Sequence, residues 1–298
     1  MQITVNMKTV KYTLAVIAAC FTLGSCTKHV VAFDYEYIAN LGKTAQFEIT
    51  YVEPVANLAV NYIDRVELNG VQIASTKGGN SLVPNGTLPG GGSEATTRFF
   101  ATKPGVNNIK FYRASGDDMV LVYDKDVNLE AKKQNLFVYS LSEDPIIIDN
   151  LYPYPKNPEK AYVATFDTDS IATVRFINFA FKGNSNTPYP GKIQYQWCHD
   201  KSRGVTGRGG VDGDWHNIGE PVGFGEATDR EIVGVWKETF NSLGQEQLWF
   251  RGIDPETGSV IISNDFWTTR IGAHMNHLYR GIKGGSPSAG ITLFGSLR

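Results

Sequence analysis

The chain has 298 residues, of which 42% are hydrophobic and 19% charged, with three cysteines and a formal net charge of -2. This hydrophobic content excludes a disordered chain, and so few cysteines in a chain of this length exclude a disulfide scaffold. The near-neutral charge provides no basic field for phosphate backbones, so we expect no nucleic-acid partner, and the length favours two domains.

The N-terminus is typical of an export signal. A short positive region precedes the apolar run Tyr12–Leu23. At about 1.5 Å of rise per residue this run is too short to cross a ~30 Å hydrocarbon core, so it predicts a signal peptide rather than an anchor helix. We assign residues 1–25 to a lipoprotein signal peptide, with either Met1 or Met7 as the start.

The segment Leu23-Gly24-Ser25-Cys26 resembles the lipobox of bacterial lipoproteins. Small residues let the signal peptidase approach the backbone, and the thiol of Cys26 then receives the diacylglycerol. We therefore expect Cys26 to be the lipidation site and the membrane to be a partner, with the protein in the outer membrane on its cell-surface or periplasmic face. The alternative is a plain secretory signal in which this cysteine has no role.

After the signal, residues 26–43 are predicted to form a tether with a lead-in strand at Val31–Tyr37. No later stretch has the ~18 consecutive apolar residues that a spanning helix needs. The body of the protein is thus expected to be tethered by lipid alone.

Residues 44–149 are predicted to form a first β domain. Gln46–Tyr51 and Tyr62–Leu68 are rich in the residues that favour strands. Asn69-Gly70 then predicts a hairpin, because both turn positions need positive φ. Helical apolar spacing is not sustained anywhere, so we expect an all-β chain. Further candidate strands are Asn108–Tyr112, Met119–Tyr123 and Leu136–Leu141.

A proline-rich segment divides the chain. Residues 150–162 contain Pro153, Pro155 and Pro158, which cannot donate a hydrogen bond to a sheet. We expect a semi-stiff linker there and a second β domain over residues 163–298.

Several segments of the first half recur in the same order in the second. The matched pairs are Glu94–Arg98 with Glu226–Arg230, Asn108–Tyr112 with Gln247–Arg251, Val120–Val122 with Val260–Ile262, and Asn135–Phe137 with His277–Tyr279. The spacings differ only by lengths that a loop absorbs, which predicts two copies of one unit. The match also predicts that Ile109, Phe111, Leu248 and Phe250 face the core.

A further pattern in the first half consists of Pro104–Tyr112, Val120-Leu121, Asn128–Lys133 and Phe137. With this pattern the first half resembles a family of repeats of unknown function that is common in lipoproteins of Bacteroides-type bacteria, often in tandem. The resemblance covers about residues 44–141, and a more diverged second copy covers about residues 172–283, where Gly272–His274 replaces the Glu-Ala-Lys portion. The resemblance implies an exported protein without established catalytic residues. It implies an all-β fold of two tandem β-sandwich domains, immunoglobulin-like or transthyretin-like.

No motif indicates catalysis or a resident metal. In the strand-like segment around Trp197 neighbouring side chains point to opposite faces, so Cys198 and His199 would not share a site. His274 and His277 are three residues apart, which on a strand places them on opposite faces. We therefore expect no enzyme, no catalytic residue, no metal site and no cofactor.

Two pairs of acids leave alternatives open. Asp212 and Asp214 lie in the Gly-rich segment Arg203–Gly219 and could ligate calcium, but the calcium-loop pattern is missing, and a solvated loop is the alternative. Glu220 and Glu226 could serve glycoside hydrolysis, which depends on a separation in space that sequence does not supply.

The tryptophans are the clearest indication of a binding surface. They all lie in the second half: Trp197, Trp215, Trp236, Trp249 and Trp267. Trp249 matches Lys110 of the first half, and Trp267 matches Asn128 if a one-residue gap is allowed. An indole in place of an outward polar residue suits a platform for a sugar face or a partner protein. We assign Trp249, Trp267 and Trp215 as candidate ligand-binding residues; the alternative is that these rings pack under a loop or against the other domain.

These features predict a lipid-anchored, non-catalytic binding or adhesion module with a glycan or a surface protein as partner. The alternative is a structural subunit of a fimbria-like or other surface assembly, in which a strand edge pairs with a neighbour. The terminal strand Gly290–Leu297 could be donated to such a neighbour or could close the second domain.

Overall fold

The computed structural model describes residues 43–55, 58–76, 82–84, 86–89, 99–149, 171–182, 187–199, 215–234, 245–270, 274–282 and 291–295. Several sequence predictions lie outside the described residues: the signal peptide, Cys26, the lead-in strand, the linker at 150–162, and Asp212 and Asp214. All described residues belong to one compact unit, Leu41–Arg298.

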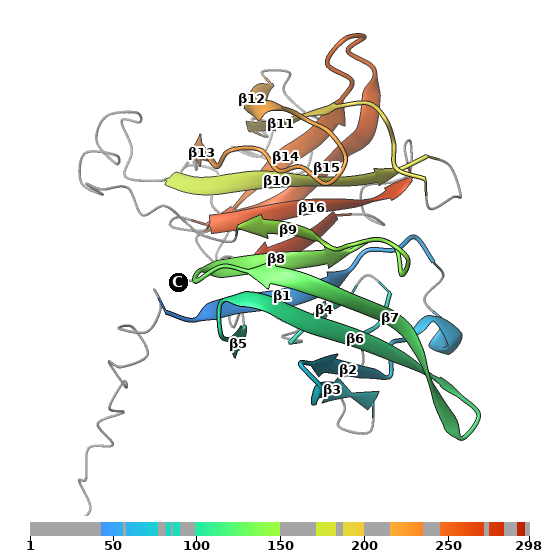
Figure 1. The fold of residues 1–298 in the computed structure, drawn as a ribbon. Helices are drawn as coiled ribbons and strands as arrows, with labels where there is room; N and C mark the ends of the chain where they lie inside the picture. Colours follow the sequence, from blue (N-terminus) through green and yellow to red (C-terminus); the bar gives the residue numbers. More distant parts are fainter. Residues whose placement is uncertain are drawn as a thin grey trace, which may run out of the picture. The chain divides into compact units, whose positions relative to one another are not determined.

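The first half, residues 43–149, forms two sheets (Figure 1). One contains, in spatial order, β3 (Val71–Ser75), β2 (Arg65–Leu68), β6 (Gly105–Ser115) and β7 (Asp118–Leu129). The other contains β4 (Thr87–Leu88), β1 (Ala45–Tyr51), β8 (Lys133–Val138) and β9 (Ile146–Asp149), with β5 (Phe100–Thr102) also paired to β1. A short 3-10 turn, η1 (Ala59–Asn61), precedes β2.

The second half, residues 171–295, also forms two sheets. One contains β12 (His216–Val222), β11 (Ile193–His199), β14 (Gln245–Ile253) and β15 (Val260–Arg270). The other contains β13 (Glu231–Gly234), β10 (Ile171–Phe181), β16 (His274–Ile282) and β17 (Ile291–Gly295). The terminal strand β17 pairs antiparallel with β16 and so completes a sheet of its own chain.

The described strands of the two halves follow one topology. In each half the first strand pairs in parallel with a later one, β1 with β8 and β10 with β16. The remaining strand pairs are antiparallel and occur in matching order, so that β3-β2-β6-β7 corresponds to β12-β11-β14-β15. This correspondence allows residues to be compared between the halves by strand register.

The all-β prediction is confirmed, since strands and one 3-10 turn are the only regular elements of the described residues. The hairpin predicted at Asn69-Gly70 is also confirmed, with Leu68 paired to Val71 and φ values of 51° and 77° at the two turn residues. Two predicted strands have wrong bounds. The strand predicted at Tyr62–Leu68 was too long, because Ile63 makes only an isolated bridge and β2 begins at Arg65. The strand predicted at Leu136–Leu141 was displaced by three residues, because β8 covers Lys133–Val138.

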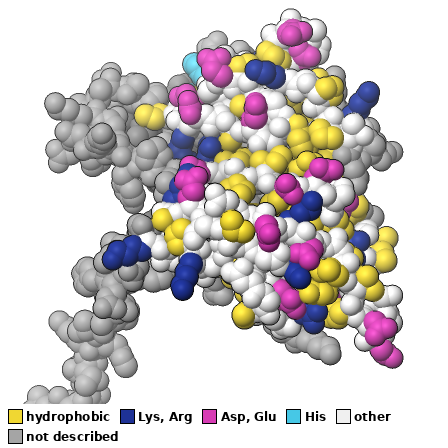
Figure 2. All heavy atoms as spheres, in the orientation of Figure 1, with side chains coloured by type: hydrophobic (Ala, Val, Ile, Leu, Met, Phe, Trp, Pro, Cys, Tyr) yellow, Lys and Arg dark blue, Asp and Glu magenta, His cyan; other side chains and the backbone are white. Residues whose placement is uncertain are grey.

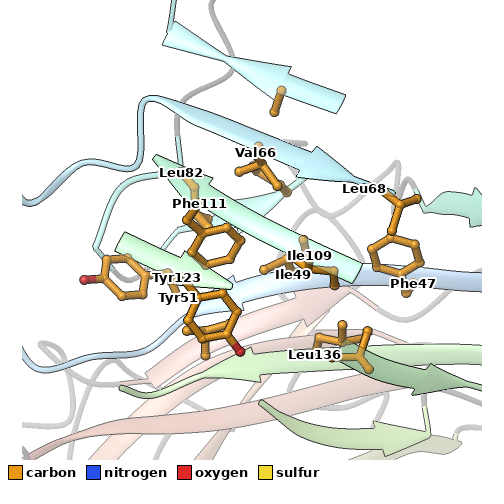
Figure 3. Close-up of a cluster of buried hydrophobic side chains, with 14 of the residues drawn as sticks. Phe47, Ile49, Tyr51, Val66, Leu68, Leu82, Ile109, Phe111, Tyr123 and Leu136 are labelled. Atoms are coloured by element: carbon orange, nitrogen blue, oxygen red, sulfur yellow. The ribbon is translucent and has the colours of Figure 1, made fainter. Parts of the chain in front are cut away.

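Each half has its own hydrophobic core between its two sheets. In the first half, Figure 3 shows Phe47, Ile49 and Leu136 of one sheet close to Val66 and Phe111 of the other. In the second half, the ring of Tyr195 lies 4.2 Å from that of Phe176 and 5.7 Å from that of Phe250, centroid to centroid. Alternating side chains therefore bury one face of each sheet.

A third cluster joins the halves, and we call it the bridging cluster. Its buried members are Val52, Phe137, Ile148, Ile177, Phe179, Phe181 and Leu278. The rings of Phe137 and Phe179 lie 4.9 Å apart, and Phe224 contacts Phe179 edge-on at 5.2 Å. These side chains project from the opposite face of the sheets that contain β1 and β10, which therefore bury side chains on both faces.

One predicted match between the halves is wrong. Leu136 belongs to the core of its own half, whereas Leu278 belongs to the bridging cluster. Because successive side chains of a strand alternate, the match of Asn135–Phe137 with His277–Tyr279 is displaced by one residue. The short apolar pattern of these strands fits either register.

On the surface, Figure 2 shows acidic and basic side chains interspersed over the visible face. Among the described residues, ion pairs such as Lys110–Asp124 and Lys125–Asp144 join neighbouring strands or loops at 3.2 and 3.1 Å. Exposed pairs of this kind contribute little to stability, about 0–1 kcal/mol each.

Candidate functional site

The sheet β12-β11-β14-β15 has an inner face on the core of the second half and an outer face. Leu248 and Phe250 of β14 are buried on the inner face, as are Ile109 and Phe111 of β6 in the first half. The predicted core positions are thus confirmed. Trp249 lies between Leu248 and Phe250 and therefore projects from the outer face.

Trp249 lies in a row of apolar side chains across three strands, which we call the apolar row. It pairs with Cys198 of β11 on one side and with Phe266 of β15 on the other. The rings of Trp249 and Phe266 meet edge to face with centroids 5.4 Å apart. Phe266 is 40% exposed, and Trp249 is half-buried. The Trp249 indole N–H is buried and has no hydrogen-bond partner among the described residues.

The first half has charged residues at the same register positions. Glu67 pairs with Lys110, and Lys110 pairs with Asp124. We call these three residues the charged row. The Lys110 Nζ lies 3.2 Å from an Asp124 carboxylate oxygen. The equivalent rows thus differ in chemistry, because the charged row is ionic and the apolar row consists of two aromatic rings and a thiol.

An arginine and a tryptophan lie beside the apolar row. The Arg251 Cζ is 4.1 Å from the ring centroid of Trp215, a cation–π distance, and Arg251 Nε donates a 2.8 Å hydrogen bond to Gln196 Oε1. Gln196 Nε2 in turn donates to Asn217 Oδ1 at 2.8 Å. Partial burial lowers the pKa of Arg251 from its ordinary value. Stacking and hydrogen bonding together fix the orientation of the guanidinium plane.

The predicted outward direction of Trp267 is wrong. Trp267 pairs with the buried Leu248 and packs against the core of the second half. By register it corresponds to Lys125, which pairs with Ile109, rather than to Asn128. Trp267 therefore packs on the core of its own half, which differs both from the predicted outward direction and from the alternative of packing under a loop or against the other domain. Trp249 and Trp215 remain candidates.

The predicted separation of Cys198 from His199 is confirmed. Cys198 is buried on the outer face beside Trp249, and His199 pairs with the inward Leu248 and meets the Trp197 ring at 5.1 Å. The strand arrangement therefore brings no base to this thiol from its sequence neighbour.

His277 is a core residue of β16. Its Nδ1 lies 3.0 Å from the Tyr195 hydroxyl, and its ring meets that of Phe250 at 4.5 Å. Burial, with a further contribution from Arg230, lowers the pKa of His277 to about 3, so the ring is neutral. The side chain of His274 lies outside the described residues. The described part of the chain brings no three potential metal ligands together.

Glu220 and Glu226, the acids that the sequence offers for glycoside hydrolysis, both lie among the described residues. Glu226 is exposed and accepts a 2.7 Å hydrogen bond from the backbone N–H of Gly223, which stabilises the turn after β12. Glu220 is an exposed residue of β12. The role that the structure gives Glu226 is therefore that of a turn residue.

Sequence reasoning missed a buried carboxyl group. Glu48 of β1 is 3% exposed and accepts a hydrogen bond from the side-chain amide of Asn135, its register partner on β8. Asn135 pairs with Ile148, so this row lies on the sheet face that carries the bridging cluster. Burial raises the pKa of Glu48 to about 8.

No family model matches this chain, and no curated protein matches it. Among solved structures it is similar to the Bacillus anthracis TIE protein, with a TM-score of 0.19, 9% identity and coverage of 81% of this chain and 34% of that one. A leucine-rich repeat protein from Bacteroides thetaiotaomicron VPI-5482 gives a TM-score of 0.18 and 8% identity over 81% of this chain and 26% of that one. The chain thus spans about a third and a quarter of their lengths. The described residues include no helix long and apolar enough to cross a membrane.

Proposed function

We propose that this protein is a non-catalytic glycan-binding module of a bacterial envelope, tethered through lipid on Cys26. The observation that supports this proposal is that the apolar row of the second half occupies the register positions of the charged row in the first half. A sugar ring has an apolar C–H face that stacks on aromatic side chains and polar edges that accept hydrogen bonds. The rings of the half-buried Trp249 and the exposed Phe266 offer the apolar contact, and the neighbouring Arg251 guanidinium offers the polar one.

We also propose that the two halves are tandem β-sandwich domains, immunoglobulin-like or transthyretin-like, of the Bacteroides-type repeat family that the sequence resembles. Support comes from the shared strand order and from the separate core of each half. In this arrangement the second domain carries the binding surface and the first domain has the same backbone without it.

The test uses the full chain purified in detergent and a panel of neutral and acidic oligosaccharides, with tryptophan fluorescence as the signal. Trp249→Ala is expected to weaken binding by at least about 10-fold, because a central aromatic contact dominates small interfaces. Lys110→Ala, the matched change in the first half, is expected to leave binding unchanged. Binding that survives Trp249→Ala would remove this face from the proposal.

Lipid attachment is tested on the same protein. Mass spectrometry of the mature N-terminus is expected to find acyl chains on Cys26, and Cys26→Ser is expected to release the protein from membranes. An unmodified cysteine in the wild-type protein would contradict the envelope anchor.

A second candidate function is a subunit of a surface assembly, and it is favoured by the edge strand β7. This strand lies at the end of its sheet and exposes Met119, Val120 and Leu121 by 39%, 47% and 45%. Exposed apolar edges of this kind pair with strands of other chains. Light scattering would find concentration-dependent oligomers that Val120→Lys disperses; a monomer at high concentration contradicts this function.

A further inference from the structure

The outer face of the second half has a cation without a carboxylate partner. Among the described residues Arg251 makes its stacking contact with Trp215 and its hydrogen bond to Gln196, and no ion pair. Cys198 is close enough to interact electrostatically with Arg251, and it occupies the register position that Glu67 has in the first half. The position that holds a carboxylate in the first half therefore holds a thiol in the second.

The first half contains a compensated arginine–aromatic stack on the corresponding outer face, with Arg65 at the register position of Gln196 and Tyr112 at that of Arg251. The Arg65 Cζ lies 3.9 Å from the ring centroid of Tyr112, and its Nε lies 3.2 Å from Glu67 Oε1. The other Glu67 oxygen accepts a 3.0 Å hydrogen bond from the Tyr112 hydroxyl. There the stacked arginine is neutralised within its own sheet, which leaves nothing for an external anion.

The polar groups beside Trp215 and the apolar row include donors that no described residue accepts from. Gln196 accepts from Arg251 and donates to Asn217 Oδ1, so among the described residues the Asn217 amide nitrogen and the terminal nitrogens of Arg251 are left to donate outward. The Trp249 indole N–H is buried and is not part of this set. A ligand that satisfies this set must be rich in acceptors and is favoured by a negative charge.

Arg251 and Trp249 lie two residues apart on one strand face, a separation of about 7 Å. A single sugar unit can therefore contact the indole with its C–H face while a substituent reaches the guanidinium. The planar fork of an arginine matches a carboxylate with two parallel hydrogen bonds.

We infer that the ligand of this face is an acidic glycan whose uronic acid carboxylate binds Arg251 while its ring stacks on Trp249. The inference rests on the proposed function and names the substrate class of the same surface. It assigns affinity for the sugar to the apolar row and selection for acidic sugars to Arg251.

The test compares two probes that differ only in charge, a galacturonate oligosaccharide and its methyl ester, by calorimetry on the full chain in detergent at low salt. The acid is expected to bind at least about 10-fold more tightly than the ester, as a charge-assisted bidentate contact provides. Arg251→Gln is expected to abolish this preference, so that the variant binds the acid and the ester with equal affinity. Arg65→Gln, which removes the compensated arginine, is the matched control and is expected to keep the preference.

The outcomes separate the inference from the proposed function. Equal affinity for acid and ester, or a preference that survives Arg251→Gln, overturns the acidic-glycan inference and leaves glycan binding standing. If neither probe binds, and the neutral and acidic panel also gives no binding, both are overturned. Circular dichroism of each variant confirms that the sheets are intact.

Discussion

Replacing the buried Glu48 with glutamine should change the pH dependence of stability in a defined way. Glu48 is 3% exposed, and burial raises its pKa from 4.5 to about 8 in the folded protein. In the unfolded chain the carboxyl group is in water and has its ordinary pKa. The folded state therefore binds a proton at neutral pH that the unfolded state has released.

The sign and size follow from proton linkage. The stability associated with the protonated carboxyl group is fully present below about pH 4.5 and decreases as the pH rises to about 8, where the folded state also ionises. At about 1.4 kcal/mol for each pH unit, the loss over this window is about 5 kcal/mol. Glu48→Gln keeps an acceptor for Asn135 and removes the titration, so its advantage over the wild type should grow from near zero at pH 4.5 to about 5 kcal/mol at pH 8.

Urea unfolding at a series of pH values measures this difference directly. Thr50→Val is a matched control on the same strand, because it removes the 3.0 Å contact between the Thr50 and Thr87 hydroxyls without removing a titratable group. It should lower stability by an amount that does not vary with pH. A constant offset between Glu48→Gln and the wild type, or an advantage that shrinks as the pH rises, would refute a buried, protonated Glu48.

Two core substitutions test the packing. Phe179→Ala removes a buried ring from the bridging cluster and should lower the unfolding free energy by about 3–5 kcal/mol, measured by urea unfolding; a loss under about 1 kcal/mol would mean that this cluster does not join the halves. Trp267→Ala should destabilise the second half by about 3 kcal/mol in the same assay, because the indole packs against its core. Since Trp267 lies on the inner face, this variant should retain glycan affinity wherever it is folded, and a selective loss of binding would contradict its inward direction.

Local sequence features predicted much of the fold. The Asn69-Gly70 hairpin depends only on backbone freedom at two residues, and the alternation in β6 and β14 is strong enough to assign Trp249 to the outer face. These signals need no partner strand to be interpreted. They therefore remained correct in the three-dimensional structure.

Features that depend on exact register across the sheets could not be predicted. Strands β6 and β7 have a register shift at Phe111/Tyr112, whereas β14 and β15 have shifts at Phe250/Gly252 and Gly252/Ile253. A bulge adds one residue to one strand and reverses the faces that follow, so an alignment that crosses different bulges does not preserve side-chain direction. The predicted direction of Trp267 failed for this reason. The burial of Glu48 could not be predicted either, because it depends on how segments distant in the sequence cover its face of the sheet.

Because both halves share one topology, side chains that the fold requires can be distinguished from side chains that ligand binding would require. The first half forms the sheet β3-β2-β6-β7 with the charged row on its outer face, so this arrangement of strands does not need apolar side chains there. Aromatic surface left half-exposed or exposed, as at Trp249 and Phe266, carries a solvation cost that core packing does not explain. Arg251 adds a second cost of the same kind, because it is a partly buried cation that has no counter-ion among the described residues. One ligand with an apolar face and a carboxylate offsets both costs, whereas a neutral sugar offsets only the first. The galacturonate oligosaccharide and its methyl ester are the decisive pair of probes because they differ in this respect.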